Sequence, residues 1–249
     1  EAETFNEIET NFNKNKFLER TFELFDSFVE NYDTPVWRDK GVYVITGGAG
    51  GLGKIFAQEI ASQVYKPVII LTGRSKLDEI KESFITHLRS IGAEVVYKEL
   101  DVTDIKGVEK FFTTIMTEFS TVNGIIHSEG IIRDNYIHKK NLEEFNSVLA
   151  PKVFGLANVD IASKDIPLDV FILFSSTAGV FGNIGQADYA AANAFMDSFS
   201  VYRNDMVACN DRSGKTVSIN WPLWKDGEMH VDAAMEQLMH LETGLKPLR

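Results

Sequence analysis

Short apolar runs alternate with segments of helical length from about residue 41 onward, and this alternation constrains the fold more than any other feature of the chain. Six runs are nearly continuously apolar and rich in β-branched residues, as expected of parallel strands that are covered on both faces. These runs span residues 42–46, 68–73, 94–100, 124–127, 170–176 and 216–221. Segments of helical length lie between them, at residues 52–65, 75–91, 105–119, 141–162 and 186–206. The alternation predicts right-handed βαβ units and therefore an α/β fold with a doubly wound, Rossmann-like parallel sheet.

The N-terminal part of the chain departs from this alternation. In residues 16–32, apolar side chains recur at helical spacing, which predicts an amphipathic helix followed by a linker that ends near Trp37. We therefore expect an N-terminal helix and linker over residues 1–40 and a main domain over residues 41–249. Because the chain begins with Glu1 rather than methionine, we also expect it to be a piece of a longer protein.

The C-terminal part carries one further helical pattern. Residues 231–244 predict an amphipathic helix that is stopped by Gly244 and Pro247. No convincing strand follows residue 221, so the sheet is expected to be truncated or completed by sequence outside this chain.

The composition argues against several classes of function. A formal net charge of −11 over 249 residues leaves no basic surplus to neutralise nucleic-acid phosphates or an anionic membrane. No apolar run is long enough to span a bilayer. The five histidines lack the spacing of metal ligands, so no metal site is expected. The single cysteine, Cys209, and the acidic balance fit a reducing, cytoplasmic location.

A glycine-rich loop, TGGAGGLG, directly follows the first predicted strand and directly precedes a helix. Glycines allow a tight turn and let backbone N–H groups approach a pyrophosphate, while the helix presents its positive N-terminus to that charge. A tight turn without a ligand is the alternative, which five glycines among eight residues make less favourable. The cofactor-binding residues predicted in this loop are Thr46, Gly47, Gly48, Gly50, Gly51, Leu52 and Gly53.

The ends of the next two strands predict which nicotinamide cofactor binds. An arginine, Arg74, stands where a carboxylate would hold the ribose 2′-hydroxyl of NADH, and a guanidinium suits a 2′-phosphate. We therefore favour NADPH, with a solvated loop cation as the alternative. Asp101 is placed to accept a hydrogen bond from the adenine amino group, and Thr103 or Asp104 to cap the following helix. The predicted cofactor-binding set thus also includes Arg74, Ser75, Asp101 and Val102.

The predicted chemistry lies in residues 173–195. A strand delivers Ser176 to the sheet's carboxyl edge, and the next helix carries Tyr189 and Asn193 on one face, four residues apart. A tyrosine can donate a proton during ketone reduction, but its reference pKa is about 10, and a nearby cation lowers it. Many small reductases place a lysine four residues after this tyrosine. Here that position is Asn193, so the cation must come from elsewhere.

Several motifs resemble the ketoreductase domains of modular polyketide synthases, which belong to the short-chain dehydrogenase/reductase superfamily. The similar stretches occur in the same order from about Gly41 to Trp224: TGGAGGLG, LDVTD, GIIHSEG, LAPKVFG, FSSTAGVFGNIGQADYAAANAF and SINWPLW. The ending NWPLWKDG looks like bacterial synthases that use free-standing acyltransferases. The resemblance implies the short-chain reductase fold and NADPH-dependent reduction of a β-ketoacyl thioester on an acyl carrier protein.

The resemblance also implies where the missing cation lies. In this family a lysine within a Lys-Val-x-Gly motif serves the active site, and here that lysine is Lys152. It would hold the nicotinamide ribose together with Tyr189 and depress the tyrosine pKa. Ser176 would polarise the substrate carbonyl, Tyr189 would donate the proton, and Asn193 would hold the lysine or a water relay. The implied catalytic tetrad is Lys152, Ser176, Tyr189 and Asn193.

Two positions carry stereochemical markers of this family. Asp134 matches the most dependable member of the Leu-Asp-Asp motif of B-type domains, although the two residues before it do not match. Phe181 stands in the loop where A-type domains carry a tryptophan. Both imply a B-type domain and a D-configured, (R) hydroxyl product. Ala191, where epimerising members carry proline, implies no α-epimerisation.

One residue departs from the family pattern. The motif that usually reads His-Ser/Ala-Ala-Gly has a carboxylate, Glu129, in this chain. An unpaired buried carboxylate is costly, so we expect Glu129 to face solvent, to pair with Arg133 or to touch an unusual substrate.

Two alternative functions stay open at this point. A reductase-like domain kept for structure or protein contacts is one, although such members usually lose the tyrosine, the asparagine or the glycines. A stand-alone short-chain reductase of small ketones is the other. For the acidic carrier protein, Lys139, Lys140 and Arg203 are candidate docking residues. Residues 1–40 would be a remnant of the family's second, structural subdomain.

Overall fold

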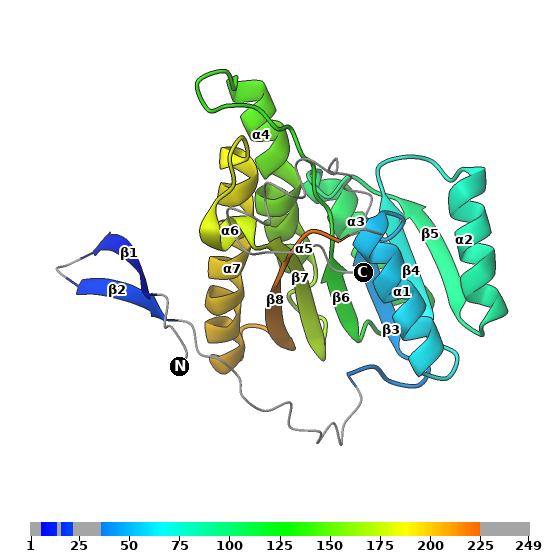
Figure 1. Ribbon diagram of the computed structural model, residues 1–249. Coiled ribbons are helices and arrows are strands. Elements are labelled where there is room, and N and C mark those ends of the chain that lie inside the picture. The colour runs from blue at the N-terminus through cyan, green and yellow to red at the C-terminus, as the bar shows by residue number, and fades with distance from the viewer. Residues whose placement is uncertain (1–5, 14–15, 22–35, 225–249) are drawn as a thin grey trace, which may run out of the picture. The chain divides into compact units, whose positions relative to one another are not determined.

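A computed structural model of the protein describes residues 6–13, 16–21 and 36–224 (Figure 1). The chain divides into two compact units, residues 1–36 and residues 37–249. In the first unit, strands β1 (Asn6–Asn13) and β2 (Lys16–Thr21) pair antiparallel, with the Cα of Glu7 opposite that of Arg20.

This pairing corrects the helix predicted over residues 16–32, because β2 occupies the first six residues of that segment. The spacing of apolar residues reflects this segment alone, whereas a β-strand forms through hydrogen bonds to a partner strand elsewhere in the chain. The spacing therefore does not reveal the strand. Residues 22–35 and the helix predicted over residues 231–244 lie outside the described part of the chain, as does any strand after Trp224.

The second unit is built on a six-stranded, wholly parallel sheet with strand order β5-β4-β3-β6-β7-β8. This order reverses its direction of growth between β3 and β6, and such switch points are where ligands bind in doubly wound folds. The strands are β3 (Val42–Thr46), β4 (Val68–Gly73), β5 (Glu94–Glu99), β6 (Gly124–His127), β7 (Val170–Ser176) and β8 (Lys215–Trp221). All six predicted strands are confirmed, with differences of at most one residue at their ends.

Helices connect the strands and cover both faces of the sheet (Figure 1). They are α1 (Gly51–Gln63), α2 (Glu79–Ser90), α3 (Ile105–Phe119), α4 (Leu142–Ala150), the π-helical turn η1 (Pro151–Gly155), α5 (Leu156–Ala162), α6 (Ala178–Phe181) and α7 (Ala187–Ala208). The single helix predicted over residues 141–162 consists of α4, η1 and α5, which follow one another without a gap. The helix α6 was not predicted. The start of α2 at Glu79 follows Asp78, whose side chain accepts a hydrogen bond from Lys81 N.

Alternate residues of strands β3, β4, β6 and β7 belong to two separate hydrophobic clusters. In β3, Val42 and Val44 pack with α3, α5 and Met196 of α7, while Tyr43 and Ile45 pack with α1 and α2. Burial on both faces explains why the strands are almost continuously apolar. In the described part of the chain, no helix is both long and apolar enough to cross a membrane.

Candidate active site

The glycine loop, Thr46–Gly53, turns from β3 into α1. Gly47 has φ +64°, a conformation that favours glycine, and Gly50 N donates to Gly47 O at 2.9 Å. Side chains would not fit at two further glycines of the loop. A Cβ at Gly48 would lie 2.7 Å from Ile45 O, and one at Gly53 would lie 2.7 Å from Gly47 O. The N-cap residue of α1 is Gly50, which has no side chain to cap the helix, so the N-terminal N–H groups of α1 could bind an anionic group.

The other predicted cofactor residues lie at the ends of β4 and β5. Arg74 and Ser75 are exposed and directly follow β4. One oxygen of Asp101 accepts hydrogen bonds from Thr103 N at 2.9 Å and Thr103 Oγ1 at 2.7 Å, so this carboxylate shapes its own turn. Asp104, not Thr103, caps α3, with its side chain accepting from Lys106 N.

Lys152 is buried in the turn η1 and points toward the end of β7. Its Nζ donates to Phe174 O at 2.7 Å and lies 3.5 Å from Met196 Sδ. The same nitrogen lies 5.8 Å from the centroid of the Tyr189 ring. The fold therefore brings together two residues that are 37 positions apart in the sequence. Burial lowers the pKa of Lys152 to about 8, while the charges of Asp197 and Glu129 act in the opposite direction.

A buried histidine at the end of β6 holds the turn that carries Lys152. His127 Nε2 lies 3.0 Å from Pro151 O, and Nδ1 lies 2.8 Å from Thr46 Oγ1. Because a carbonyl oxygen can only accept, Nε2 carries the proton and Nδ1 accepts from the threonine hydroxyl. Burial lowers the pKa of His127 to about 3, with the Lys152 charge acting in the same direction, so the ring is neutral. The sequence analysis assigned His127 no role, although it lies in the GIIHSEG motif.

Tyr189 lies in the first turn of α7 and is 8% exposed. Burial raises the pKa of its phenol above the usual value; hydrogen bonding by Ser176 and Asn193 lowers it, and the Asp134 charge raises it. The prediction that Lys152 holds this pKa below its usual value is wrong, because burial dominates. The phenol is thus kept in its protonated form.

Asn193 is buried one turn after Tyr189. Its side-chain Nδ2 donates to the backbone oxygen of Tyr189 at 2.7 Å. Its backbone carbonyl oxygen accepts from Ser175 Oγ at 3.2 Å. Lys152 Nζ donates to Phe174 O rather than to Asn193, so the first predicted role of Asn193, holding the lysine, is not seen. The alternative role, holding a water relay, stays a prediction. The side-chain oxygen of Asn193 is buried and has no hydrogen-bond partner among the described residues.

A further carboxylate, missed in the sequence, ties α7 to the strands. Asp197 accepts hydrogen bonds from Ser218 Oγ at 2.6 Å and Asn220 Nδ2 at 2.8 Å. Asn220 Nδ2 also lies 3.2 Å from Ser176 O, so the network reaches the candidate catalytic serine. Spacing of four residues from Asn193 was the available signal for Asp197, because it places both on one face of α7.

Asp134, a predicted stereocontrol residue, is joined to the start of α7, and Phe181, the other, lies in the preceding helix α6. Both carboxylate oxygens of Asp134 accept from Gln186 Nε2, at 3.0 and 3.2 Å. Asn135 N donates to Gly185 O at 3.0 Å, which further joins the two segments. Phe181 is 59% exposed at the end of α6.

Two of the three candidate docking residues for an acidic carrier are already engaged. The Lys140 side chain is 3% exposed and forms an ion pair with Asp188 at 2.7 Å. Arg203 is buried and pairs with Asp160 at 2.7 Å. Neither is available for a partner, and only Lys139 of the three is exposed.

Glu129 is 8% exposed, which contradicts the expectation that it faces solvent. Burial raises the pKa of its carboxyl group, and the largest opposing influence is the charge of Arg74. The predicted pairing with Arg133 is also wrong, because Arg133 is not among the charges that act on this group.

Buried polar side-chain atoms without a partner in the described residues gather at the carboxyl edge of the sheet. Thr72 is the second-to-last residue of β4, Glu129 follows β6, and Trp221 ends β8. Asn193 faces the end of β7 through its bond from Ser175. Such atoms normally have partners, and a polar ligand along this edge would supply them. The complete set is Thr72 Oγ1, Glu129 Oε1, Asn193 Oδ1, Trp221 Nε1 and Trp224 Nε1.

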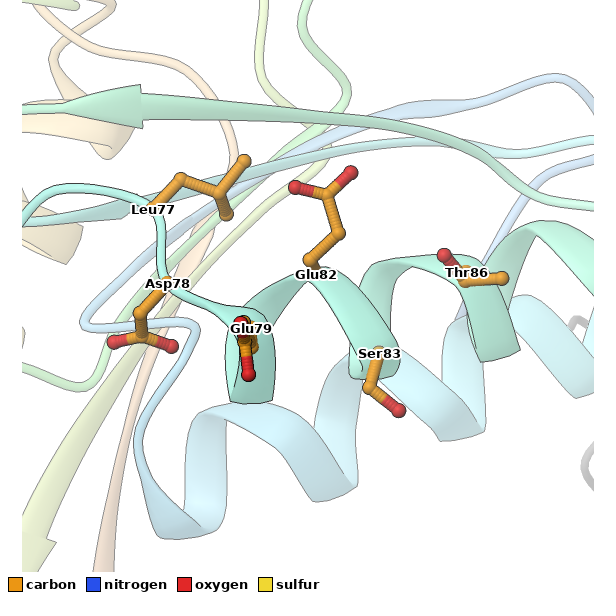
Figure 2. Close-up of a pocket in the computed structure, with 6 residues that line it drawn as sticks. All are labelled: Leu77, Asp78, Glu79, Glu82, Ser83 and Thr86. Atoms are coloured by element: carbon orange, nitrogen blue, oxygen red, sulfur yellow. The ribbon is translucent and has the colours of Figure 1, made fainter.

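A pocket at the start of α2 is separate from these residues. It is lined by Leu77, Asp78, Glu79, Glu82, Ser83 and Thr86, with carboxylates on several sides (Figure 2). Its lining includes no predicted site residue, and its acidic character would repel a pyrophosphate.

Comparisons with known proteins show which family this chain is similar to. A family profile described as "KR domain" matches residues 41–226. Polyketide synthase PksN of Bacillus subtilis (strain 168) is 52% identical over 213 residues, or 86% of this chain. Polyketide synthase PksL of the same organism is 54% identical over 209 residues, or 84% of this chain. The chain spans only 4% and 5% of the lengths of these two relatives.

A solved structure is similar over nearly the whole chain. The crystal structure of a ketoreductase domain from the bacillaene assembly line is 51% identical, with a TM-score of 0.88. The match covers 93% of this chain and 54% of that chain.

Proposed function

The chain belongs to the KR domain family, the ketoreductases of polyketide synthases, and on that premise we propose the reaction and the cofactor of this domain. It reduces a β-ketoacyl thioester on an acyl carrier protein to the D-configured, (R) β-hydroxyacyl thioester, and it uses NADPH. The observation that carries the proposal is the convergence of buried Lys152 on the ring of Tyr189, 5.8 Å away.

The residues of the carboxyl edge fit a nicotinamide dinucleotide. The glycine loop would hold the pyrophosphate, Arg74 a 2′-phosphate, and Asp101 the adenine, while Lys152 and Tyr189 would hold the nicotinamide ribose. The unpartnered polar atoms along this edge support that fit. When bound, NADPH supplies the hydride.

The protein's own groups manage the proton and the developing negative charge. Tyr189, whose phenol stays protonated, is placed to donate its proton to the substrate oxygen. Ser176 would donate a hydrogen bond to the same oxygen as charge develops. Lys152, with a pKa of about 8, is mostly charged at pH 7 and stabilises the phenolate that forms.

The configuration of the product is proposed from Asp134 and Phe181. The hydrogen bonds from Gln186 to Asp134 support this role of Asp134, because Gln186 lies three residues before Tyr189. The pair would limit the direction from which the substrate approaches Tyr189. Ala191 supports reduction without α-epimerisation.

The division of the chain near residue 36 supports a domain organisation in which residues 41–249 are catalytic. Residues 1–40 would then be a remnant of a structural subdomain, and other domains of the same cytoplasmic synthase would be the partners.

The test is NADPH consumption with a carrier-bound β-ketoacyl thioester, followed by chiral analysis of the product. We expect turnover and a D-configured hydroxyl group. Cofactor binding without turnover would favour a domain kept for structure, and an L-configured product would overturn the argument from Asp134.

A further inference from the structure

Glu129 is a buried carboxylate whose role the reduction reaction leaves unexplained. It follows the last residue of β6 by two positions, at the switch point of the sheet, and is 8% exposed. Its Oε1 atom is buried without a hydrogen-bond partner in the described part of the chain. An unsatisfied buried acceptor is costly, so a group that donates to it would recover free energy.

The surroundings of Glu129 place it in the half of the edge nearest β4 and β5. A Cβ at Gly47 would lie 3.1 Å from Glu129 N, so its backbone lies against the first glycine of the loop. Three charges act on its carboxyl group: first that of Arg74 at the end of β4, then Asp101 at the end of β5, and last Lys152. The contact with Gly47, the first glycine of the loop that would hold the pyrophosphate, points to the adenosine half of a dinucleotide rather than its nicotinamide half. The stronger influence of Arg74 than of Lys152 agrees with this position.

The chemistry of the group narrows what it can bind. An ionised carboxylate only accepts hydrogen bonds, and a pyrophosphate offers only acceptors. Ribose hydroxyl groups are the donors that an adenosine ribose presents at this position. A 2′-phosphate, by contrast, would bring negative charge toward Glu129.

We propose that Glu129 lowers the domain's selectivity between the two nicotinamide cofactors. Its carboxylate accepts a hydrogen bond from a hydroxyl of the adenosine ribose, and its charge opposes the 2′-phosphate that Arg74 attracts. The domain therefore binds NADH with an affinity closer to that for NADPH than Arg74 alone would give. This proposal rests on the proposed function, since it requires a nicotinamide dinucleotide at this edge.

The test is direct binding to the purified domain, measured by calorimetry without substrate. Dissociation constants are determined for NADH and NADPH in the wild type and in Glu129→Gln, which removes the charge and keeps the shape. We expect Glu129→Gln to bind NADPH more tightly and NADH more weakly than the wild type. The ratio of the two dissociation constants should change by about tenfold or more, the size expected when one charge interaction is lost. The matched control is Glu109→Gln, which removes an exposed carboxylate on α3, away from the glycine loop, and should leave the ratio unchanged.

Fragments assign the effect to one half of the cofactor. ADP and its 2′-phosphorylated analogue contain only the adenosine ribose, and their ratio should move with that of the dinucleotides. A change confined to the dinucleotides would put Glu129 at the nicotinamide ribose and overturn the proposal. An unchanged ratio in a variant that still binds both cofactors would also overturn it. Failure of the wild type to bind either cofactor would instead refute the proposed function, on which this inference depends.

Discussion

Two parts of the sheet's carboxyl edge are built in different ways. The glycine half, residues 46–53 with the ends of β4 and β5, is shaped by backbone: Gly47 has φ +64° and a Cβ at Gly53 would lie 2.7 Å from Gly47 O. The tyrosine half consists of η1, the end of β7 and the first half of α7. It is shaped by buried polar side chains, among them Lys152 and Asn193.

This difference decides what each half tolerates. The glycine half excludes added atoms and leaves its N–H groups for a ligand, so its changes should act on cofactor affinity. The tyrosine half depends on ionisable groups that hold one another, so its changes should act on turnover. The predictions that follow test that division, from the largest effect to the smallest.

Tyr189→Phe should lower kcat by about 10²- to 10⁴-fold, because it removes the proton donor and leaves the ring in place. The dissociation constant for NADPH should rise far less, by about tenfold at most, because the phenylalanine lacks only the hydroxyl that would hold the nicotinamide ribose. Steady-state kinetics with a β-ketoacyl thioester, together with calorimetry, checks both. A comparable loss of affinity would show that the two halves are not separable.

The wild-type kcat should fall as the pH rises through about 8, because the charged form of Lys152 is lost above its pKa of about 8. Asp197→Asn should move this fall to lower pH, since the Asp197 charge favours the protonated lysine. Glu118→Gln, an exposed carboxylate on α3, is the matched control. A fall at the same pH in all three proteins would contradict the assignment to Lys152.

Gly53→Ala should weaken NADPH binding by about tenfold or more, because its Cβ would meet Gly47 O and force the loop to shift. With saturating cofactor, kcat should change little. Equal losses in kcat and in affinity would mean that the glycine loop also positions the chemical groups.

His127→Gln should lower the free energy of unfolding by about 1–3 kcal/mol, because one of two buried hydrogen bonds is lost. In the wild type, the unfolded chain binds a proton at His127 below pH about 6.5 that the folded protein, with a pKa of about 3, does not. Stability should therefore fall on acidification across that window, and the variant should show a shallower fall. Urea denaturation at several pH values measures both effects; an unchanged slope would refute the neutral histidine.

Much of this arrangement follows from the sequence because the signals are local. All six strands of the main sheet could be predicted from apolar runs, since burial on both faces leaves a continuous pattern. The glycine loop could also be located from a local signal, because the glycines that its turn requires all lie within Thr46–Gly53.

What could not be predicted depends on partners distant in the sequence. The strand β2 was predicted as helix because its partner β1 lies outside the segment that was judged. The position of Lys152 came from resemblance to a family, not from spacing. The burial of Glu129 and the neutral state of His127 depend on residues from several strands, which a single segment does not reveal.

The most direct test of the central claim, that the tyrosine half acts as one unit, is a double-mutant cycle on kcat/KM with Lys152→Ala and Tyr189→Phe. Groups that act through one another lose activity non-additively, so the double variant should be about as active as Tyr189→Phe alone. The cross-half pair Gly53→Ala and Tyr189→Phe should instead show additive losses. Additive losses for Lys152 and Tyr189 would contradict the account, because they would mean that the lysine does not act through the tyrosine.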